Sequence, residues 1–350
     1  MRKIAPFALF LLSASFVSAQ QGGLERIEKK WGDASKLLDD RRFEAERRID
    51  ERFNRLSTRL SNAWGKVDRS DKKVFVDYTE DGKGKTKIEF EKGFVAVEVI
   101  EDVSREKLLK DDLLKKIKDQ LKAAETNVDG TGVQVLKNQI DPAKEKEALA
   151  APQRETYTAP DGTAKVKYTV QVPMVANQMT ERAKLYVPLA RKCGERYGVP
   201  VDLILAVMEC ESTFNPYADN GIAYGLMQLT PKVGAHDAAL SVFGEKQDVP
   251  SHKLKNAELN ANLGTALLMQ YMTWDGWLGK YKAKTYKWEM LAIAGYNAGC
   301  GRSVAFASKN PAAMADTDAN FFKALHAYMP DETKHYLINV PKARLQYKGL

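Results

Sequence analysis

The sequence has few of the residues that usually hold metals or cross-link small domains. Its 350 residues include three cysteines and four histidines. Their spacings match no zinc-binding pattern, so we expect no metal site and no cofactor. In an exported chain one disulfide could form among Cys193, Cys210 and Cys300, which would leave one free thiol. The spacing favours no particular pair.

Long apolar runs are also missing beyond the first 19 residues. This first segment has a basic start at Arg2 and Lys3, then an apolar stretch, and small residues ending at Ala19. Such a pattern is typical of a signal peptide that is cleaved before Gln20. No later segment approaches about 20 consecutive apolar residues, so we expect an exported mature chain without a transmembrane segment. No cysteine lies near the cleavage site, so the sequence does not support a lipid anchor.

A concentrated basic patch is the third missing feature. The formal net charge is +8, from 54 Lys and Arg against 46 Asp and Glu, but the basic residues are interleaved with acidic ones. Nothing matches a nucleic-acid-binding motif. We therefore expect no nucleic acid as partner, and an anionic polymer such as cell wall fits the charge better.

A charged segment, residues 20–64, follows the signal peptide. From Leu24 to Trp64 its apolar residues recur mostly at three- and four-residue steps, which predicts a long amphipathic helix. Acid-before-base pairs at four-residue spacing, such as Glu25 and Lys29, support it. Two interpretations stay open. The helix is either a solvated one that leans on its neighbour or a seam for self-association or a protein partner.

Residues 65–172 predict a small α+β domain. Three alternating segments separated by glycine-containing turns indicate an antiparallel meander, and a leucine-rich helix and a returning strand come later. A segment rich in Lys, Glu, Ala and Pro before that strand is typical of a linker. No group of titratable residues suggests catalysis, so a structural or binding role is the default. The expected elements are strands Val74–Thr79, Thr86–Glu91, Phe94–Ile100 and Ala164–Val172, helix Leu108–Leu121 and linker Asp141–Glu155.

Residues 173–350 predict a compact, predominantly helical domain, which makes the whole chain α+β. The pattern is one of mostly short helices joined by glycine-bearing loops. The expected helices are Glu181–Tyr197, Val201–Glu211, Glu258–Met272, Lys287–Asn297, Asp318–Ala327 and Glu332–Val340.

Glu211 is the strongest catalytic candidate because it ends an apolar helix. At about 100° per residue, Ile204, Val207 and Met208 fall within roughly 60° of Glu211. Glu209 falls on the far side and should be a solvated acid. Partial desolvation disfavours a carboxylate, so the pKa of Glu211 should lie above its reference of about 4.3. A carboxyl group that keeps its proton near neutral pH can serve as a general acid.

Four motifs in the second domain support that choice. Each alone is weak, but all four occur in order. They are Glu211-Ser212-x-Phe214-Asn215-Pro216, Gly225-Leu226-Met227-Gln228, Tyr296-Asn297-Ala298-Gly299-x-Gly301 and Glu332-Thr333-x-x-Tyr336-x-x-x-Val340. Together they resemble the soluble-lytic-transglycosylase family, whose goose-type-lysozyme-like domain cleaves peptidoglycan.

The resemblance extends into the first domain. The segment Phe90–Glu98 and the pair Trp64-Gly65 are similar to the N-terminal domain of membrane-bound lytic murein transglycosylase C, although the lipobox cysteine of that group is absent here. Two departures lie in the second domain. The loop Ala218–Gly225 is one residue shorter than usual, with Asn220 where a serine falls, and Gly295 and Cys300 replace an alanine and a proline.

The resemblance implies a periplasmic lytic transglycosylase whose partner is the peptidoglycan glycan strand. Glu211 would protonate the β-1,4 bond between N-acetylmuramic acid and N-acetylglucosamine, then act as base while a 1,6-anhydro ring closes. Tyr336 would orient the acetamido group or Glu211 itself. The implied substrate-binding residues are Ser212, Asn220, Met227, Gln228, Tyr296 and Asn297.

Two alternatives stay open at this point. A goose-type muramidase would hydrolyse the same bond with an activated water, for which Asp219 is the candidate base. A non-catalytic cell-wall-binding scaffold would use the cleft only to grip glycan.

Overall fold

A computed structural model describes residues 56–129, 131–273 and 286–350 of the chain. Residues 68–350 form one compact unit, and residues 1–67 form another. In the latter only residues 56–67 are described, and 56–64 of these are helical. The predicted signal peptide and most of the predicted amphipathic helix lie outside the described residues. Among the described residues, no helix combines the length and the apolar character needed to cross a membrane.

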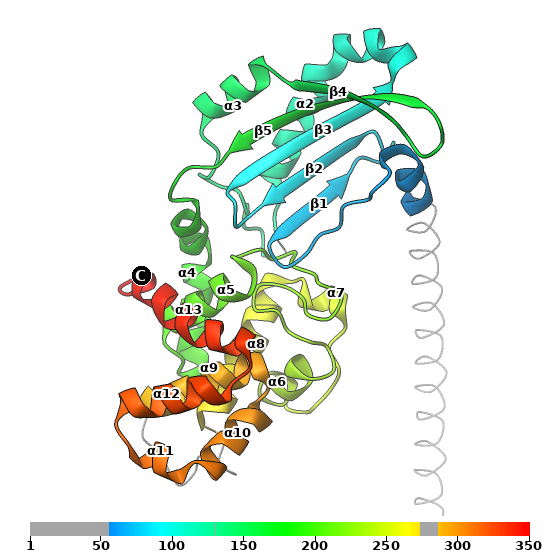
Figure 1. The fold of residues 1–350 in the computed structure, drawn as a ribbon. Coiled ribbons are helices and arrows are strands. Elements are labelled where there is room, and N and C mark those ends of the chain that lie inside the picture. Colours follow the sequence, from blue (N-terminus) through cyan, green and yellow to red (C-terminus); the bar gives the residue numbers. More distant parts are fainter. Residues whose placement is uncertain (1–55, 130, 274–285) are drawn as a thin grey trace, which may run out of the picture. The chain divides into compact units, whose positions relative to one another are not determined.

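An antiparallel sheet of five strands forms the first part of the compact unit. Figure 1 shows the strands side by side in the order β1-β2-β3-β5-β4. Four of them were predicted within a few residues, because they alternate apolar and polar side chains as a sheet with one covered face requires. The strands are β1 Val74–Tyr78, β2 Gly84–Glu89, β3 Phe94–Asp102, β4 Gln153–Thr158 and β5 Ala164–Pro173.

The predicted linker Asp141–Glu155 is wrong. Its first part is helix α3, Pro142–Ala150, which begins with a proline and is capped by Asp141, whose carboxylate accepts a hydrogen bond from the Ala143 amide at 2.8 Å. Its last residues open the edge strand β4, which pairs with β5. β4 is exposed along almost its whole length, so it lacks the apolar alternation that identifies a strand.

Helix α2, Glu106–Thr126, closes the apolar face of the sheet. Leu109, Leu113, Ile117 and Leu121 repeat at four-residue steps and are all buried in one cluster with the sheet. Burial of each such side chain contributes roughly 1.5–3 kcal/mol. The leucine-rich segment predicted this helix, but Leu108 and Leu114 are exposed, so its leucines do not all lie on the covered face.

The rest of the compact unit is helical, so the fold is mixed α+β as predicted, with a helix-dominated second part. The six predicted helices are present with ends shifted by at most three residues, except that the last one continues to Tyr347, seven residues beyond the predicted Val340. Four further helices are short, and the sequence pattern missed them. The helices are α4 Gln178–Tyr197, α5 Val201–Ser212, α6 Gly234–Phe243, α7 Ser251–Leu254, α8 Ala257–Thr273, α9 Tyr286–Ala298, α10 Cys300–Lys309, α11 Pro311–Ala315, α12 Asp318–Tyr328 and α13 Asp331–Tyr347.

Helix α5 is the buried centre of the helical part. All residues from Leu203 to Met208 are inaccessible to solvent, as expected of a helix that is apolar on every side. Helices α4 and α13 pack against it. The helix ends where Thr213 and Phe214 both take left-handed backbone conformations, with φ of 54° and 60°. This abrupt end leaves Glu211 on the last turn.

Buried polar residues join the sheet to the helical part. Arg182 of α4 is fully buried, donates a hydrogen bond to the Phe90 carbonyl at 2.8 Å, and lies 4.8 Å from the centre of the Phe90 ring. The Tyr186 hydroxyl, one turn further along α4, donates to the Asp129 carboxylate at 3.2 Å. The first residues of α4 are therefore fixed to the sheet as well as to α5.

Candidate functional site

A cavity of about 360 Å³ contains Glu211. Its lining comes from the last turn of α5, from α13, and from loops of the sheet region. Of the residues predicted from the sequence, it brings together Glu211, Asn297 and Tyr336. The full lining is Lys72, Lys73, Glu91, Met179, Glu209, Cys210, Glu211, Thr213, Asn297, Glu332, His335, Tyr336, Asn339, Lys342, Ala343 and Gln346.

Burial raises the pKa of the Glu211 carboxyl from 4.5 to about 7. The Tyr336 hydroxyl and the positive charge of Lys72 act in the opposite direction, and the negative charge of Glu332 adds to the increase. The direction predicted from the apolar helix face is therefore confirmed. At pH 6 to 7 a large share of Glu211 carries the proton that a general acid needs.

Tyr336, on α13, is the nearest hydroxyl partner of this carboxyl. Its side chain is buried, with 7% of the surface exposed, and burial together with the charge of Glu211 holds its pKa well above the usual value. The hydroxyl faces Glu211 closely enough to lower the carboxyl pKa, yet it has no hydrogen-bond partner of ordinary geometry among the described residues. A neutral hydroxyl with a free donor next to the acid can orient either Glu211 or a bound acetamido group.

Glu209 is not the solvated acid that helix periodicity predicted. It is half-buried, lines the same cavity, and accepts a hydrogen bond from the Tyr347 hydroxyl near the chain's last residue. The partner comes from the end of α13, which packs along α5. A helical wheel of α5 alone cannot show that a second helix covers its far side.

Tyr296 and Asn297 hold the third motif against the other elements of the site. The Tyr296 hydroxyl donates to the Met227 carbonyl at 2.8 Å, and burial, with a smaller contribution from the charge of Glu211, raises its pKa. The Thr333 hydroxyl donates to the Asn297 carboxamide at 2.6 Å. The α9 motif is thus tied to the second motif and to α13 at once.

Ser212 and Met227 are buried. The Ser212 hydroxyl donates to the Leu226 carbonyl at 2.7 Å and joins α5 to the turn of the second motif. The Met227 side chain packs against Gly264 of α8, where an added Cβ would lie 2.5 Å from the Met227 sulfur. Both residues therefore hold the surrounding elements together and do not line the cavity.

Gly225 and Gln228 shape the turn itself. Gly225 has φ of 77°, and an added Cβ would lie 2.2 Å from the Leu254 carbonyl oxygen, so only glycine fits. Gln228 also has a positive φ, 46°. Its carboxamide nitrogen donates to the Gly225 carbonyl, and its carboxamide oxygen has no partner among the described residues.

Asn260 organises this turn, and the sequence reasoning missed it. The residue is fully buried on α8. Its carboxamide oxygen accepts from the Met227 amide at 2.8 Å, and its nitrogen donates to the Tyr224 carbonyl at 2.8 Å and the Leu254 carbonyl at 2.9 Å. The signal for it in the sequence is weak, because the same helix contains a second asparagine, Asn262, and other polar residues.

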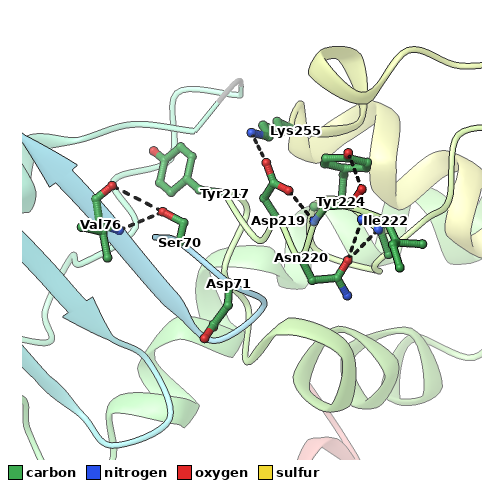
Figure 2. A network of polar contacts seen from close by, with 12 residues as sticks. Ser70, Asp71, Val76, Tyr217, Asp219, Asn220, Ile222, Tyr224 and Lys255 are labelled. Carbon is green, nitrogen blue, oxygen red and sulfur yellow. Dashed lines mark hydrogen bonds and ion pairs between the residues drawn. The ribbon is translucent and has the colours of Figure 1, made fainter. Parts of the chain in front are cut away.

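The shortened loop 218–225 uses its polar side chains internally (Figure 2). The Asn220 carboxamide oxygen accepts from the Ile222 and Ala223 amides at 3.0 and 2.8 Å, and Asn220 is exposed outside the cavity lining. Asp219 forms an ion pair with Lys255 at 2.7 Å and accepts from the Gly221 amide. Neither side chain lines the Glu211 cavity. Asp219, the candidate base for a muramidase, is instead ion-paired with Lys255.

The cysteines are free thiols in the structure. Cys193 is buried, and Cys210 lines the cavity beside Glu211, where burial raises its thiol pKa to about 12. Among the described residues, no group of three or more His, Cys, Asp or Glu side chains is arranged to hold a metal ion.

Comparisons with known proteins match both parts of the chain. Residues 188–318 match the family described as "Transglycosylase SLT domain", and residues 42–129 match "Membrane-bound lytic murein transglycosylase C, N-terminal domain". The protein named membrane-bound lytic murein transglycosylase C in Serratia proteamaculans is 28% identical over 83% of this chain and 87% of its own length. Its namesake in Glaesserella parasuis is 34% identical over 52% of this chain and 50% of its own.

The solved structure of the 70-kDa soluble lytic transglycosylase of Escherichia coli is 25% identical, with a TM-score of 0.39, over 49% of this chain and 25% of that one. The family assignment depends on the sequence matches. Both parts of the chain are therefore similar to lytic transglycosylases, residues 188–318 to the transglycosylase SLT domain family and residues 42–129 to the N-terminal domain of membrane-bound lytic murein transglycosylase C.

Proposed function

We propose that the chain is a peptidoglycan lytic transglycosylase with Glu211 as its acid and base. The single observation that carries the residue assignment is the cavity carboxyl whose pKa is raised to about 7. The family matches name the reaction class, and the cavity supplies a group able to perform it.

In the proposed reaction, protonated Glu211 gives its proton to the oxygen that links N-acetylmuramic acid to N-acetylglucosamine. The muramyl centre gains oxocarbenium character as the bond breaks. The carboxylate left behind then takes the proton from the muramyl 6-hydroxyl, whose oxygen attacks the anomeric carbon. A 1,6-anhydro ring forms, Glu211 is protonated again, and no water is consumed.

The other acids in the cavity are less suited to this role. Glu209 accepts from the Tyr347 hydroxyl, and Glu91 is paired with Lys73. Glu332 is exposed to solvent. Tyr336 supports the reaction as an orienting group, and Asn297, Tyr296 and Gln228 are proposed to contact or shape the bound glycan. Substrate contacts by the buried Ser212 and Met227, or by Asn220, would require the surrounding segments to move.

The proposed place of action is the periplasm. The relatives are named membrane-bound, which places those proteins in the cell envelope, and peptidoglycan lies in the same compartment. The predicted signal peptide at residues 1–19 would deliver the chain there. Fractionation of cells that express the full chain, with residues 1–19 present or deleted, tests this part of the proposal.

The deciding experiment incubates purified sacculi with the mature chain and with Glu211→Gln, and identifies the soluble products by mass spectrometry. We expect anhydro-muropeptides from the wild type and a loss of about 10² to 10⁴ in rate for Glu211→Gln, which is the usual worth of a positioned acid–base group. Glu332→Gln is the matched control, an exposed carboxylate that lines the same cavity, and should keep most of the activity. Products with a reducing muramic end, about 18 Da heavier because hydrolysis adds one water, would identify a muramidase instead.

A further inference from the structure

The sheet region contributes a charged wall to the Glu211 cavity. Lys72, Lys73 and Glu91 line the cavity together with residues of α5 and α13. Lys73 and Glu91 form an ion pair that neutralises both. Lys72 is half-buried and has no ion-pair partner among the described residues, and its charge acts on Glu211. When Glu211 is protonated, its carboxyl no longer offers Lys72 a negative charge.

A tight turn fixes Lys72 in this wall. The Asp71 amide donates to the Val74 carbonyl at 2.9 Å, and the Asp71 carboxylate accepts from the Lys73 and Val74 amides at 2.7 and 2.8 Å. Just before the turn, the Ser70 hydroxyl accepts from the Val76 amide at 2.9 Å (Figure 2). Lys72 and Lys73 occupy the two central positions of a turn whose backbone is held at both ends.

The second half of the first catalytic motif holds this turn against the helical part. Asn215 is fully buried and donates to the Asp71 carbonyl at 3.4 Å, while its carboxamide oxygen accepts from the Tyr217 amide at 3.0 Å. The Tyr217 ring in turn packs on Phe75 of β1, with 4.9 Å between ring centres. The chain segment that follows Glu211 is therefore the same segment that positions Lys72.

We propose that Lys72 binds a carboxylate on the lactyl–peptide arm of the muramyl residue and so makes the sheet region part of the substrate site. The proposal rests on the proposed function, because that function places a muramyl residue at Glu211. Peptidoglycan is a glycan strand whose muramyl residues carry anionic arms, while its sugar rings are neutral. A lysine without an ion-pair partner in this wall can bind the anionic arm without contacting the neutral sugar rings. Lys342 also lines the cavity, but it is exposed on α13.

The test measures binding, so it does not depend on turnover. The mature chain carrying Glu211→Gln is titrated with three probes: a glycan tetrasaccharide with peptide stems, the same tetrasaccharide without stems, which keeps lactyl carboxylates, and chitotetraose, which has no carboxylate. We expect Lys72→Ala in this background to weaken binding of the stem-bearing probe about 10-fold, the scale of a hydrogen bond to a charged group. Binding of chitotetraose should be unchanged. In the stem-bearing probe the lactyl carboxyl is an amide, so its carboxylates lie on the stem. No weakening on the stem-free probe therefore shows that Lys72 binds stem carboxylates alone, and weakening there shows that it also binds a free lactyl carboxylate at the same place.

Two control variants test whether the effect comes from the charge of Lys72. Lys72→Arg should keep most of the affinity because the charge stays. Lys118→Ala removes an exposed lysine of the sheet region that does not line the cavity, and it should change nothing. Weakening of all three probes alike, or of none, would overturn the proposal. An inactive wild type that still shows the Lys72 effect would overturn the proposed function and leave this inference standing.

Discussion

Glu106 in the sheet region and Glu211 in the helical region both lie beside a tyrosine hydroxyl, and their pKa values move in opposite directions. The Tyr168 hydroxyl donates to Glu106 at 2.6 Å, and Arg154 donates to the same carboxylate at 2.7 and 2.8 Å. These partners lower the pKa of Glu106 to about 2. Glu211 faces Tyr336 but has no arginine partner in the described part of the chain, and burial raises its pKa to about 7.

The difference shows that a tyrosine neighbour does not decide the protonation of a carboxyl group. In both places the hydroxyl lowers the pKa. A paired guanidinium fixes the charged form of Glu106, whereas the charge of Lys72 lowers the pKa of Glu211 without offsetting desolvation, and the charge of Glu332 adds to the increase. The sheet region uses its carboxylate to hold β4, β5 and α2 together, and the helical region keeps a proton available.

The largest expected effect is the pH dependence of the unfolding free energy that burial of Glu211 causes. The folded-state pKa of about 7 lies above the unfolded value of 4.5. The stabilising contribution of the protonated form is therefore complete below pH 4.5 and is lost as the pH rises through 7. Compared with Glu211→Gln, the wild type should lose up to about 3 kcal/mol of unfolding free energy between pH 4.5 and pH 8.5.

Denaturant unfolding of both proteins at these two pH values measures that loss. Glu332→Gln serves as the control, because Glu332 lines the same cavity but is exposed. A wild type and a Glu211→Gln variant whose stability difference is independent of pH would show that the carboxyl keeps an ordinary pKa.

The next effect separates the orienting role of Tyr336 from its electrostatic one. In Tyr336→Phe the hydroxyl that lowers the Glu211 pKa is gone, so that pKa should rise further. The alkaline limb of the pH–rate profile on sacculi should move to higher pH, because the general acid stays protonated longer. The maximal rate should nevertheless fall by about 10-fold if a positioned hydrogen bond is lost.

Tyr168→Phe is the matched control for this measurement, since it removes the corresponding hydroxyl beside Glu106. It should leave the rate and the pH profile unchanged. A Tyr336→Phe enzyme whose alkaline limb moves to lower pH would mean that the hydroxyl stabilises the protonated carboxyl, contrary to the structure.

The sequence predicted what depends on local periodicity. The apolar face of α5 identified Glu211 and the direction of its pKa, and the leucine-rich segment identified helix α2. The fold class and the reaction class followed from patterns and motifs within short segments. The proposed domain boundaries and the roles of individual site residues stay predictions.

What the sequence did not show depends on residues far apart in the chain. Glu209 and Tyr347 are 138 residues apart, and Asn215 and Asp71 are 144 apart. No local pattern reports that Lys72 lines the cavity of Glu211, or that Asn260 supports the turn at Met227. Strand β4 was missed for a related reason, because its strand character comes from pairing with β5 and not from burial of its own side chains.

The smallest expected effect is at Glu106, and its sign is opposite to that at Glu211. The folded-state pKa of Glu106 is about 2 against an unfolded value of 4.5, so its stabilising contribution is present above pH 4.5 and disappears as the pH falls through 2. Glu106→Gln should lower the melting temperature slightly at pH 7 and lose this effect near pH 2. Solvent screening of the exposed Arg154 keeps the change small.

Thermal melts at several pH values, with transglycosylase activity measured in parallel, complete the comparison. Activity should be unchanged in Glu106→Gln, because the carboxylate lies outside the Glu211 cavity. Glu147→Gln is a suitable control, since Glu147 forms only an exposed ion pair with Lys144 at 2.9 Å. If Glu106→Gln destabilised the protein equally at pH 2 and pH 7, the side chain would act through its shape and neutral hydrogen bonds. In that case the negative charge of the Glu106 carboxylate, which distinguishes it from Glu211, would not stabilise the contacts among β4, β5 and α2.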